Sequence, residues 1–257
     1  ASVCSPTPAD RAVTRRADIV VLDGGPGASG EVSPLTDGLA ARGHNVLEPV
    51  QTGYTIADII TALRRDIVRG CASPVVLVGW SWGAWLALLY AATHPDDVQR
   101  VVLVGCPPLT ETGAAQLRHT RAARRDPAHM AEIEALSTAP SDPQITARLM
   151  YLFDLSDAFD PIGTPHPAVT IDWVQHRAIW AEASSMRRSG ALLHRIATLP
   201  MPVRALHGVH DPHPAADVAR SLSALPDFGM TVIDACGHKP WREAQVDFVA
   251  LLDAQLT

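Results

Sequence analysis

The sequence lacks an excess of basic charge, and this limits the partners to expect. Lysine and arginine number 21 against 27 aspartates and glutamates, so the net charge of the 257 residues is −6. The one arginine-rich stretch, "RHTRAARR" at 118–125, is interpreted as a solvated helix face. A chain without a basic stripe is a poor match for nucleic acid or an anionic membrane. We therefore expect neither as a partner.

Long hydrophobic runs are also missing. The runs "DIVVLDGG", "PVVLVGW" and "RVVLVG" are far shorter than the ~20 residues that a membrane-spanning helix needs. The first residues, "ASVCSPTPAD", show no basic-then-apolar signal pattern, although a leader already removed would leave none. We expect a cytoplasmic protein.

Cysteine is scarce and scattered. The four cysteines, Cys4, Cys71, Cys106 and Cys236, form no C-x-x-C pair. This distribution is typical of free thiols in a reducing compartment, and one disulfide stays open. Cys236 precedes His238 by two residues, and we expect it to pack rather than to react, because no group nearby in the sequence would stabilise a thiolate.

The sequence does contain many short runs of valine, isoleucine and leucine between glycines or prolines. Such runs are typical of strands buried on both faces of a parallel sheet. Strands are predicted at 19–22, 45–49, 75–78, 101–104, 203–206 and 230–233, and helices at 34–42, 55–70, 82–93, 215–224 and 241–255. This alternation predicts the α/β class with a doubly wound, mostly parallel sheet.

One long interval, 107–199, breaks the alternation. It holds helical patterns and proline-rich joints but no convincing strand, and it carries many large apolar side chains. A loop of that length is unusual inside a compact domain, so a helical insertion is expected. We predict a core formed by 1–106 and 200–257, with 107–199 as a lid over the carboxyl ends of the strands, where ligands bind in such sheets.

The stretch "GWSWG" at 79–83 lies between a predicted buried strand and a predicted apolar helix. It matches G-x-S-x-G, in which the glycines permit a sharp bend that exposes the serine hydroxyl above the sheet. The helix that follows would direct its free N–H groups at the same point. A simple strand-to-helix turn is the alternative, but the context favours Ser81 as a nucleophile.

A nucleophilic serine needs a base and an acid that orients the base. Asp211 follows the predicted strand at 203–206, and His238 follows the last predicted strand. The chain order Ser81, Asp211, His238 is the order that this strand–turn–helix motif requires. Taken singly, Asp211 could be a turn former and His238 a loop residue. The ordered set predicts a catalytic triad.

The stretch "LDGGPG" at 22–27 follows the first strong strand and would lie beside the nucleophile. By itself it reads as a tight turn, and it lacks the lysine and spacing of a phosphate loop. Next to Ser81 it predicts an oxyanion hole, with backbone N–H donors from Gly25 and Trp82.

The order G-G-P-G, G-x-S-W-G, G-x-x-D, G-H-x-x-W-x-E resembles the α/β-hydrolase superfamily over nearly the whole chain. Within it, "GGPG", "SWG" and "GHKPWRE" resemble the proline iminopeptidase branch, whose members remove N-terminal residues or cleave related amides and esters. Two features differ from that branch. Asp23 stands where a histidine is usual, and "PVQTGYT" at 49–55 replaces an Arg-Gly-x-Gly stretch.

Other functions are less well supported. His207, His210, Asp211 and His213 lie close in the sequence, but their spacing matches no metal motif, so no metal and no cofactor are expected. A small-molecule receptor on the same fold stays open, as does acyl transfer or ring closure in a biosynthetic pathway, because an acyl-enzyme serves both transfer and hydrolysis.

We therefore predict a serine hydrolase that cleaves an ester, thioester or amide of a small, apolar substrate, with a proline iminopeptidase-like aminopeptidase as an alternative. The substrate is expected to be a small molecule or short peptide, and the protein a monomer or homodimer. Large side chains near the nucleophile and in the lid suggest an apolar pocket, with packing in the core as the alternative for Trp80 and Trp82. Its predicted lining residues are Trp80, Tyr151, Phe153 and Trp180.

Overall fold

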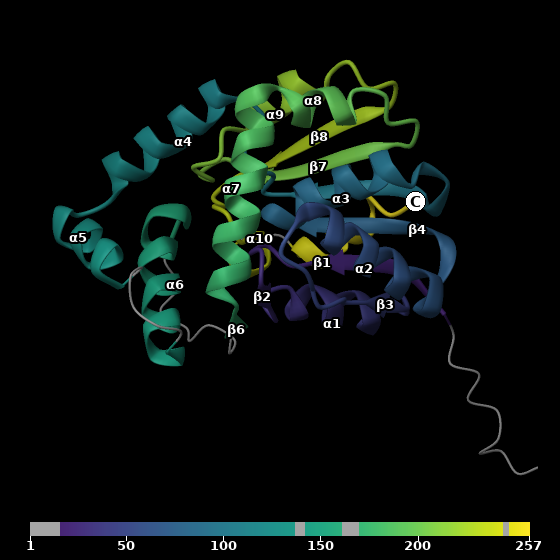
Figure 1. Ribbon diagram of the computed structural model, residues 1–257, viewed down its shortest axis with the longest axis horizontal. Coiled ribbons are helices and arrows are strands. Elements are labelled where there is room, and N and C mark those ends of the chain that lie inside the picture. Colours follow the sequence, from purple (N-terminus) through teal and green to yellow (C-terminus); the bar gives the residue numbers. More distant parts are fainter. Residues whose placement is uncertain (1–15, 137–141, 161–169, 244–246) are drawn as a thin grey trace, which may run out of the picture.

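A six-stranded parallel sheet forms the centre of the molecule (Figure 1). The computed structural model describes residues 16–136, 142–160, 170–243 and 247–257. The strands run β3-β1-β4-β5-β7-β8 across the sheet, and every neighbouring pair is parallel. Their bounds are β1 (Ala17–Leu22), β3 (Val46–Leu47), β4 (Cys71–Trp80), β5 (Val98–Val104), β7 (Val203–Gly208) and β8 (Phe228–Ile233). The predicted α/β class and sheet are confirmed.

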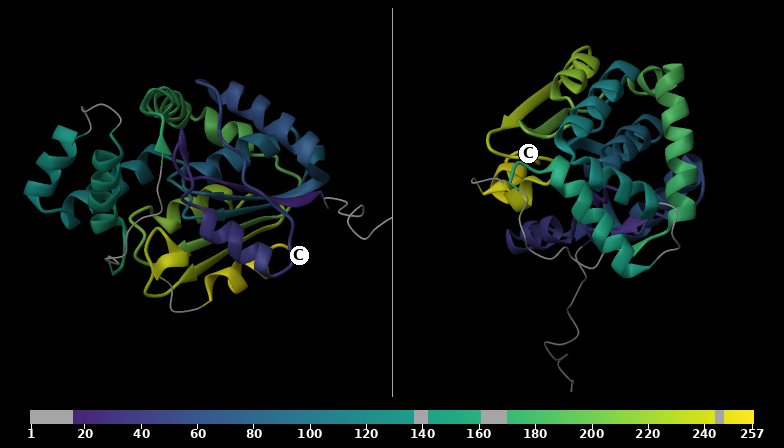
Figure 2. Two further views of the ribbon diagram at one scale, coloured as in Figure 1. Left: turned by 90° about the horizontal axis from the view of Figure 1, so that it is seen from below. Right: turned by 90° about the vertical axis from the view of Figure 1, so that its left-hand side faces the viewer.

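Helices cover both faces of the sheet (Figure 2) because alternate strand residues point to opposite sides. In β1, Val20 and Leu22 belong to one buried cluster, and Ile19 and Val21 belong to the other. The first cluster is completed from α2 (Ile56–Gly70), α3 (Trp82–Thr93), α8 (Ala191–Ile196) and α9 (Ala215–Leu222). The second is completed from α1 (Ser33–Ala41) and α11 (Phe248–Asp253).

The helix predicted at 241–255 is wrong as one element. The structure has α10 (Pro240–Glu243) and α11 (Phe248–Asp253), and Asp247 caps α11 by accepting a hydrogen bond from the Ala250 N–H. An aspartate that caps a new helix start ends the preceding helix, although the apolar pattern continues past it. The described helices at the other predicted positions agree with the predictions to within two residues at each end.

Among the described residues between β5 and α8, there are four helices: α4 (Glu111–Arg124), α5 (Pro127–Leu136), α6 (Pro143–Asp157) and α7 (Trp173–Ser189). In Figure 1, α4, α5 and α6 lie together beyond one end of the sheet, and α7 runs between them and the strands. The interval also holds β6 (Thr170–Ile171), which pairs antiparallel with β2 (Ala28–Ser29). This pair was not predicted, since two residues carry no periodic signal. The lid role and the boundaries at 106 and 200 stay predictions.

Three of the four cysteines are described, and Cys71, Cys106 and Cys236 are buried and free. Cys4 lies outside the described residues. Among the helices of the described part of the chain, none combines the length and apolar character needed to cross a membrane.

The start of α3 lies directly against the end of β1, and Gly83 makes this possible. A Cβ at Gly83 would lie 2.3 Å from the Leu22 carbonyl oxygen and 2.7 Å from that of Asp23. Both atoms are backbone, so neither can move without shifting a strand. The contact fixes the position of the strand-to-helix bend at residue 81.

We predict that Gly83→Ala lowers the free energy of unfolding by about 1–3 kcal/mol, because the added methyl group overpacks a rigid site. Gly70→Ala is the matched control. It lies in the last turn of α2, where a Cβ would meet only Leu47 at 3.7 Å, so it should stabilise by roughly 0.5–1 kcal/mol. Urea denaturation of both variants measures the difference. Equal effects of the two changes would contradict the packing argument.

Candidate active site

Ser81 lies on a strained bend between β4 and α3. Its backbone has φ 52° and ψ −123°, which non-glycine residues rarely adopt. Its N–H donates to the Val104 carbonyl at 2.9 Å, which ties the bend to the neighbouring strand. A Cβ at Gly79 would lie 2.1 Å from the Gly83 carbonyl oxygen, so this position has no room for a side chain. The bend predicted from "GWSWG" is present.

Asp211 and His238 follow the carboxyl ends of β7 and β8, and their side chains meet. The His238 Nδ1 lies 2.9 Å from Asp211 Oδ2, and both side chains are buried. The His238 backbone N–H donates to the Asp157 carbonyl at 2.9 Å, and the Trp80 Nε1–H donates to the His238 carbonyl at 2.9 Å. Helix α6 and strand β4 therefore hold the histidine loop from two sides.

Burial and charge act in opposite directions on this pair. Burial alone lowers the pKa of His238, but the carboxylates of Asp211 and Asp157 outweigh it and raise the pKa above its ordinary value of 6.5. Burial alone raises the pKa of Asp211, yet the neighbouring histidines, His238 first, lower it well below 3.8. Asp211 is therefore an anion that stabilises a proton on His238.

Ser81 and His238 line the same cavity, which has a volume of about 570 Å³. Among the predicted residues, Gly25, Trp80, Phe153 and Trp180 also line it. Other apolar contributors include Pro107, Leu117, Met150 and Trp173. The size and the largely aromatic and aliphatic walls suit a small apolar ligand.

The prediction for Tyr151 is corrected. Its side chain is 40% exposed, packs under the Arg148 guanidinium, and is not among the described residues that line the cavity. Helix α6 instead presents Met150, Phe153 and Asp154, which lie at the three- and four-residue spacing of one helix face. Tyr151 is one position out of phase with that face.

The two predicted oxyanion donors do not converge in this conformation. The Trp82 N–H donates to the Gly24 carbonyl at 3.0 Å. The N–H of Gly25 belongs to the same trans peptide as that carbonyl, so it points the opposite way. Gln51 holds the surroundings together, because its side chain donates to the Asp23 carbonyl and accepts from the Trp82 indole.

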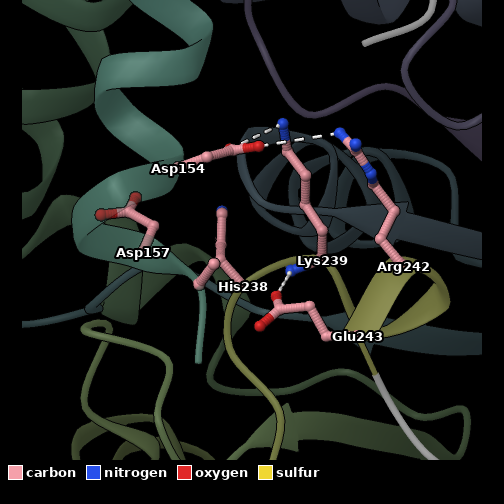
Figure 3. A pocket seen from close by; sticks show the side chains of 7 residues that line it. Asp154, Asp157, His238, Lys239, Arg242 and Glu243 are labelled. Carbon is pink, nitrogen blue, oxygen red and sulfur yellow. Dashed lines mark hydrogen bonds and ion pairs between the residues drawn. The ribbon is translucent and has the colours of Figure 1, made fainter. Parts of the chain in front are cut away.

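A buried charge cluster that sequence reasoning missed lies beside His238 (Figure 3). The Lys239 Nζ lies 2.9 Å from Glu31 and 3.0 Å from Asp154, and Arg242 lies 3.7 Å from the other oxygen of Asp154. Glu243 accepts from the Gly237 N–H at 3.1 Å, which braces the loop that carries His238. Lys239, Arg242 and Glu243 belong to the "GHKPWRE" stretch, but Glu31 and Asp154 are far from it in the sequence, which gives no signal that they meet it.

Metal and thiol chemistry have little support here. Among the described residues, Asp211, His213 and His238 each have a possible ligand atom within 4.8 Å of the others, but both imidazoles already lie at hydrogen-bond distance from the Asp211 carboxylate, 2.6 and 2.9 Å. Burial raises the pKa of Cys236 to about 12, so this thiol stays protonated at neutral pH, as a packing residue should.

Asp23, at the position where the resembled branch has a histidine, is buried in the turn beside Ser81. Its carboxylate accepts from Gly24 N–H at 3.3 Å and Gly30 N–H at 2.7 Å. Burial, together with Glu31, raises its pKa from 3.8 to about 7. The folded state therefore favours the protonated form, and ionising Asp23 destabilises the fold.

We predict that protonated Asp23 makes its whole contribution to the free energy of unfolding below pH 4, and that this contribution is lost as the pH rises to about 7. The loss is about 4 kcal/mol at most. In Asp23→Asn this slope should disappear, whatever constant offset the amide introduces. The measurement is urea denaturation between pH 4 and 8, with exposed Asp37→Asn as control. Parallel pH curves for wild type and Asp23→Asn would contradict the assignment.

Compared with models of known protein families, the sequence matches that of the Alpha/beta hydrolase family over residues 11–251. A curated relative, the biotin biosynthesis bifunctional protein BioHC of Teredinibacter turnerae (strain ATCC 39867 / T7901), is 24% identical over 191 residues, which is 71% of this chain and 33% of the relative. The chain thus spans about a third of the length of that relative.

Two solved structures show the shared fold. VinJ superposes with a TM-score of 0.68 at 19% identity, covering 94% of this chain and 90% of its own. A proline iminopeptidase of Mycobacterium smegmatis gives a TM-score of 0.62 at 16% identity, covering 93% and 89%. At these identities the likeness concerns the fold alone.

Proposed function

The chain belongs to the alpha/beta hydrolase family, and we propose that it acts as a serine hydrolase with Ser81 as its nucleophile. The observation that carries this proposal is that Ser81, on a strained bend, lines the same cavity as His238, and that His238 is hydrogen-bonded to the buried Asp211. A non-glycine residue held at positive φ is costly, by about 1–3 kcal/mol, and such strain clusters at functional sites.

The proposed reaction has two halves. Ser81 Oγ attacks the carbonyl carbon of an ester, thioester or amide while its proton passes to His238 Nε2. The tetrahedral intermediate collapses, the leaving group takes the proton from His238, and the acyl group stays on Ser81. Water then attacks the acyl-enzyme, gives a proton to His238, and releases the acid as that proton returns to Ser81. Asp211 orients His238 and stabilises its imidazolium form throughout.

The oxyanion of the intermediate needs N–H donors. The Trp82 N–H donates a hydrogen bond to the Gly24 carbonyl. We propose that the substrate oxygen replaces this carbonyl as the acceptor of that hydrogen bond. Rotation of the peptide between Gly24 and Gly25 would turn the Gly25 N–H toward the same point. Glycine at both positions keeps the barrier to that rotation low.

The cavity walls favour an apolar acyl group, with an aminopeptidase as the second candidate. Glu31 and Asp154 line the cavity and could hold a substrate amine. However, both carboxylates are already within 3.0 Å of the Lys239 ammonium. We therefore rank esters and thioesters above peptides. Cytoplasmic location and the choice between monomer and homodimer remain predictions.

We predict that Ser81→Ala lowers turnover of short-chain p-nitrophenyl esters by on the order of 10⁶-fold, to the blank rate. Ser223→Ala, an exposed serine next to α9, is the matched control and should keep full activity. The same rates on alanyl, leucyl and prolyl anilides rank the two candidates. Preference for the anilides would make the aminopeptidase the leading assignment. Comparable ester turnover by pure Ser81→Ala would refute the nucleophile.

A further inference from the structure

The carboxylate of Asp211 is shared by two imidazoles. His238 Nδ1 lies 2.9 Å from Oδ2, and His213 Nδ1 lies 2.6 Å from Oδ1. The His213 backbone N–H also donates to Oδ1, at 2.9 Å. A triad needs only the first of these contacts. The second imidazole is therefore a feature of the site that the proposed mechanism does not use.

The two imidazoles are also stacked. Their ring centroids lie 4.2 Å apart with an interplanar angle of 26°, and both rings line the cavity. Trp80 contacts the His238 ring as well, with centroids 5.2 Å apart. With Nδ1 on Asp211 and one face on His213, the His238 ring has little freedom to rotate, so its Nε2 stays directed away from Asp211.

His213 is neutral in this arrangement. Burial, reinforced by the proximity of His238, lowers its pKa to about 4 although Asp211 opposes the change. Because the contact with Asp211 is made by Nδ1, a neutral His213 donates to that carboxylate only if Nδ1 carries its proton. His207 holds the loop that carries His213, because its Nε2 lies 2.7 Å from the His213 carbonyl oxygen.

Several other charged groups around the two imidazoles form ion pairs, while Glu243 accepts from the Gly237 N–H at 3.1 Å. Arg121 of α4 forms an ion pair with Asp157 of α6, and both act on the pKa of His238. Lys239, the residue after His238, is held by Glu31 and Asp154. His207 of β7 lies 3.5 Å from Asp211 Oδ2. Among the contacts described for the Asp211 carboxylate, the one with His213 Nδ1 is the shortest, at 2.6 Å.

We propose that His213 is a positioning residue that limits how strongly Asp211 draws the proton of His238 and that keeps the His238 ring in its working orientation. The inference rests on the proposed function. A hydrogen bond donated to a carboxylate stabilises its negative charge and leaves less of that charge for a second donor. His213 therefore makes His238 a weaker base than an unshared aspartate would.

Removing the His213 hydrogen bond should raise the pKa of His238 and move the acidic limb of the pH profile upward by about one pH unit, a tenfold change in the protonation equilibrium. His213→Leu removes the donor and fills the space. His213→Asn keeps a donor, because its amide nitrogen can occupy the position of Nδ1. His119→Asn is the control, since His119 is exposed on α4.

The test follows the rate at which a fluorophosphonate modifies Ser81, read by intact mass between pH 5 and 9. We expect the acidic limb of the His213→Leu profile to lie about one pH unit above that of wild type. The acidic limbs of His213→Asn and His119→Asn should coincide with that of wild type. A merely structural role would change the maximal rate or the melting temperature without moving the limb. Coincident limbs for all four proteins, or equal shifts in the leucine and asparagine variants, would overturn the proposal.

A second measurement uses the wild-type protein and needs no variant to fold. Nitrogen-15 NMR of the histidine rings should find His213 neutral at pH 7 with its proton on Nδ1. A charged His213, or a proton on Nε2, would overturn the inference independently of activity. If wild-type Ser81 is not labelled at any pH, the proposed function fails, whereas the NMR result still decides the role of His213.

Discussion

The backbone of Ser81, held at φ 52°, is the constraint on which the rest of the site depends. Such a conformation persists only when the surrounding structure determines it. The bend is braced by the Ser81 N–H on the Val104 carbonyl and by side-chain-free positions at Gly79 and Gly83, where backbone atoms of α3 and β1 leave no space. Ser81 lines the cavity, and the residues on either side of it contact the rest of the site. The Trp82 N–H donates to the Gly24 carbonyl, and the Trp80 indole donates to the His238 carbonyl.

Buried charge is the second organising feature, and it links the helices beyond β5 to the loops that carry Asp211 and His238. The carbonyl of Asp157 accepts from the His238 N–H, while the side chain of Asp157 pairs with Arg121 of α4. Arg124 of the same helix donates to the carbonyl of His210, the residue before Asp211. Helices α4 and α6 are thus bonded to the loops that hold Asp211 and His238. A displacement of either helix would therefore shift the loops that carry Asp211 and His238 as well as the wall of the cavity.

Much of this could be predicted from the sequence, and the failures have physical causes. Strands buried on both faces leave continuous apolar runs, and their carboxyl ends then bring Ser81, Asp211 and His238 together from distant positions. The prediction that Tyr151 lines the cavity is wrong because the sequence of an apolar helix does not indicate which of its faces lies against a cavity. His213 was weighed only as a metal ligand, since its role depends on a turn that brings its ring onto Asp211. The orientation of the Gly24 carbonyl is a single peptide torsion, which no residue pattern encodes.

The central claim is that Ser81 forms a covalent acyl-enzyme. The most direct test mixes the protein with excess p-nitrophenyl butyrate, quenches with acid after milliseconds, and locates any added mass by proteolysis and tandem mass spectrometry. We expect a butyryl group on the peptide that contains Ser81, accumulating before steady state and disappearing as the ester is exhausted. Turnover of the ester with Ser81 unmodified throughout, or with the butyryl group on another residue, would contradict it.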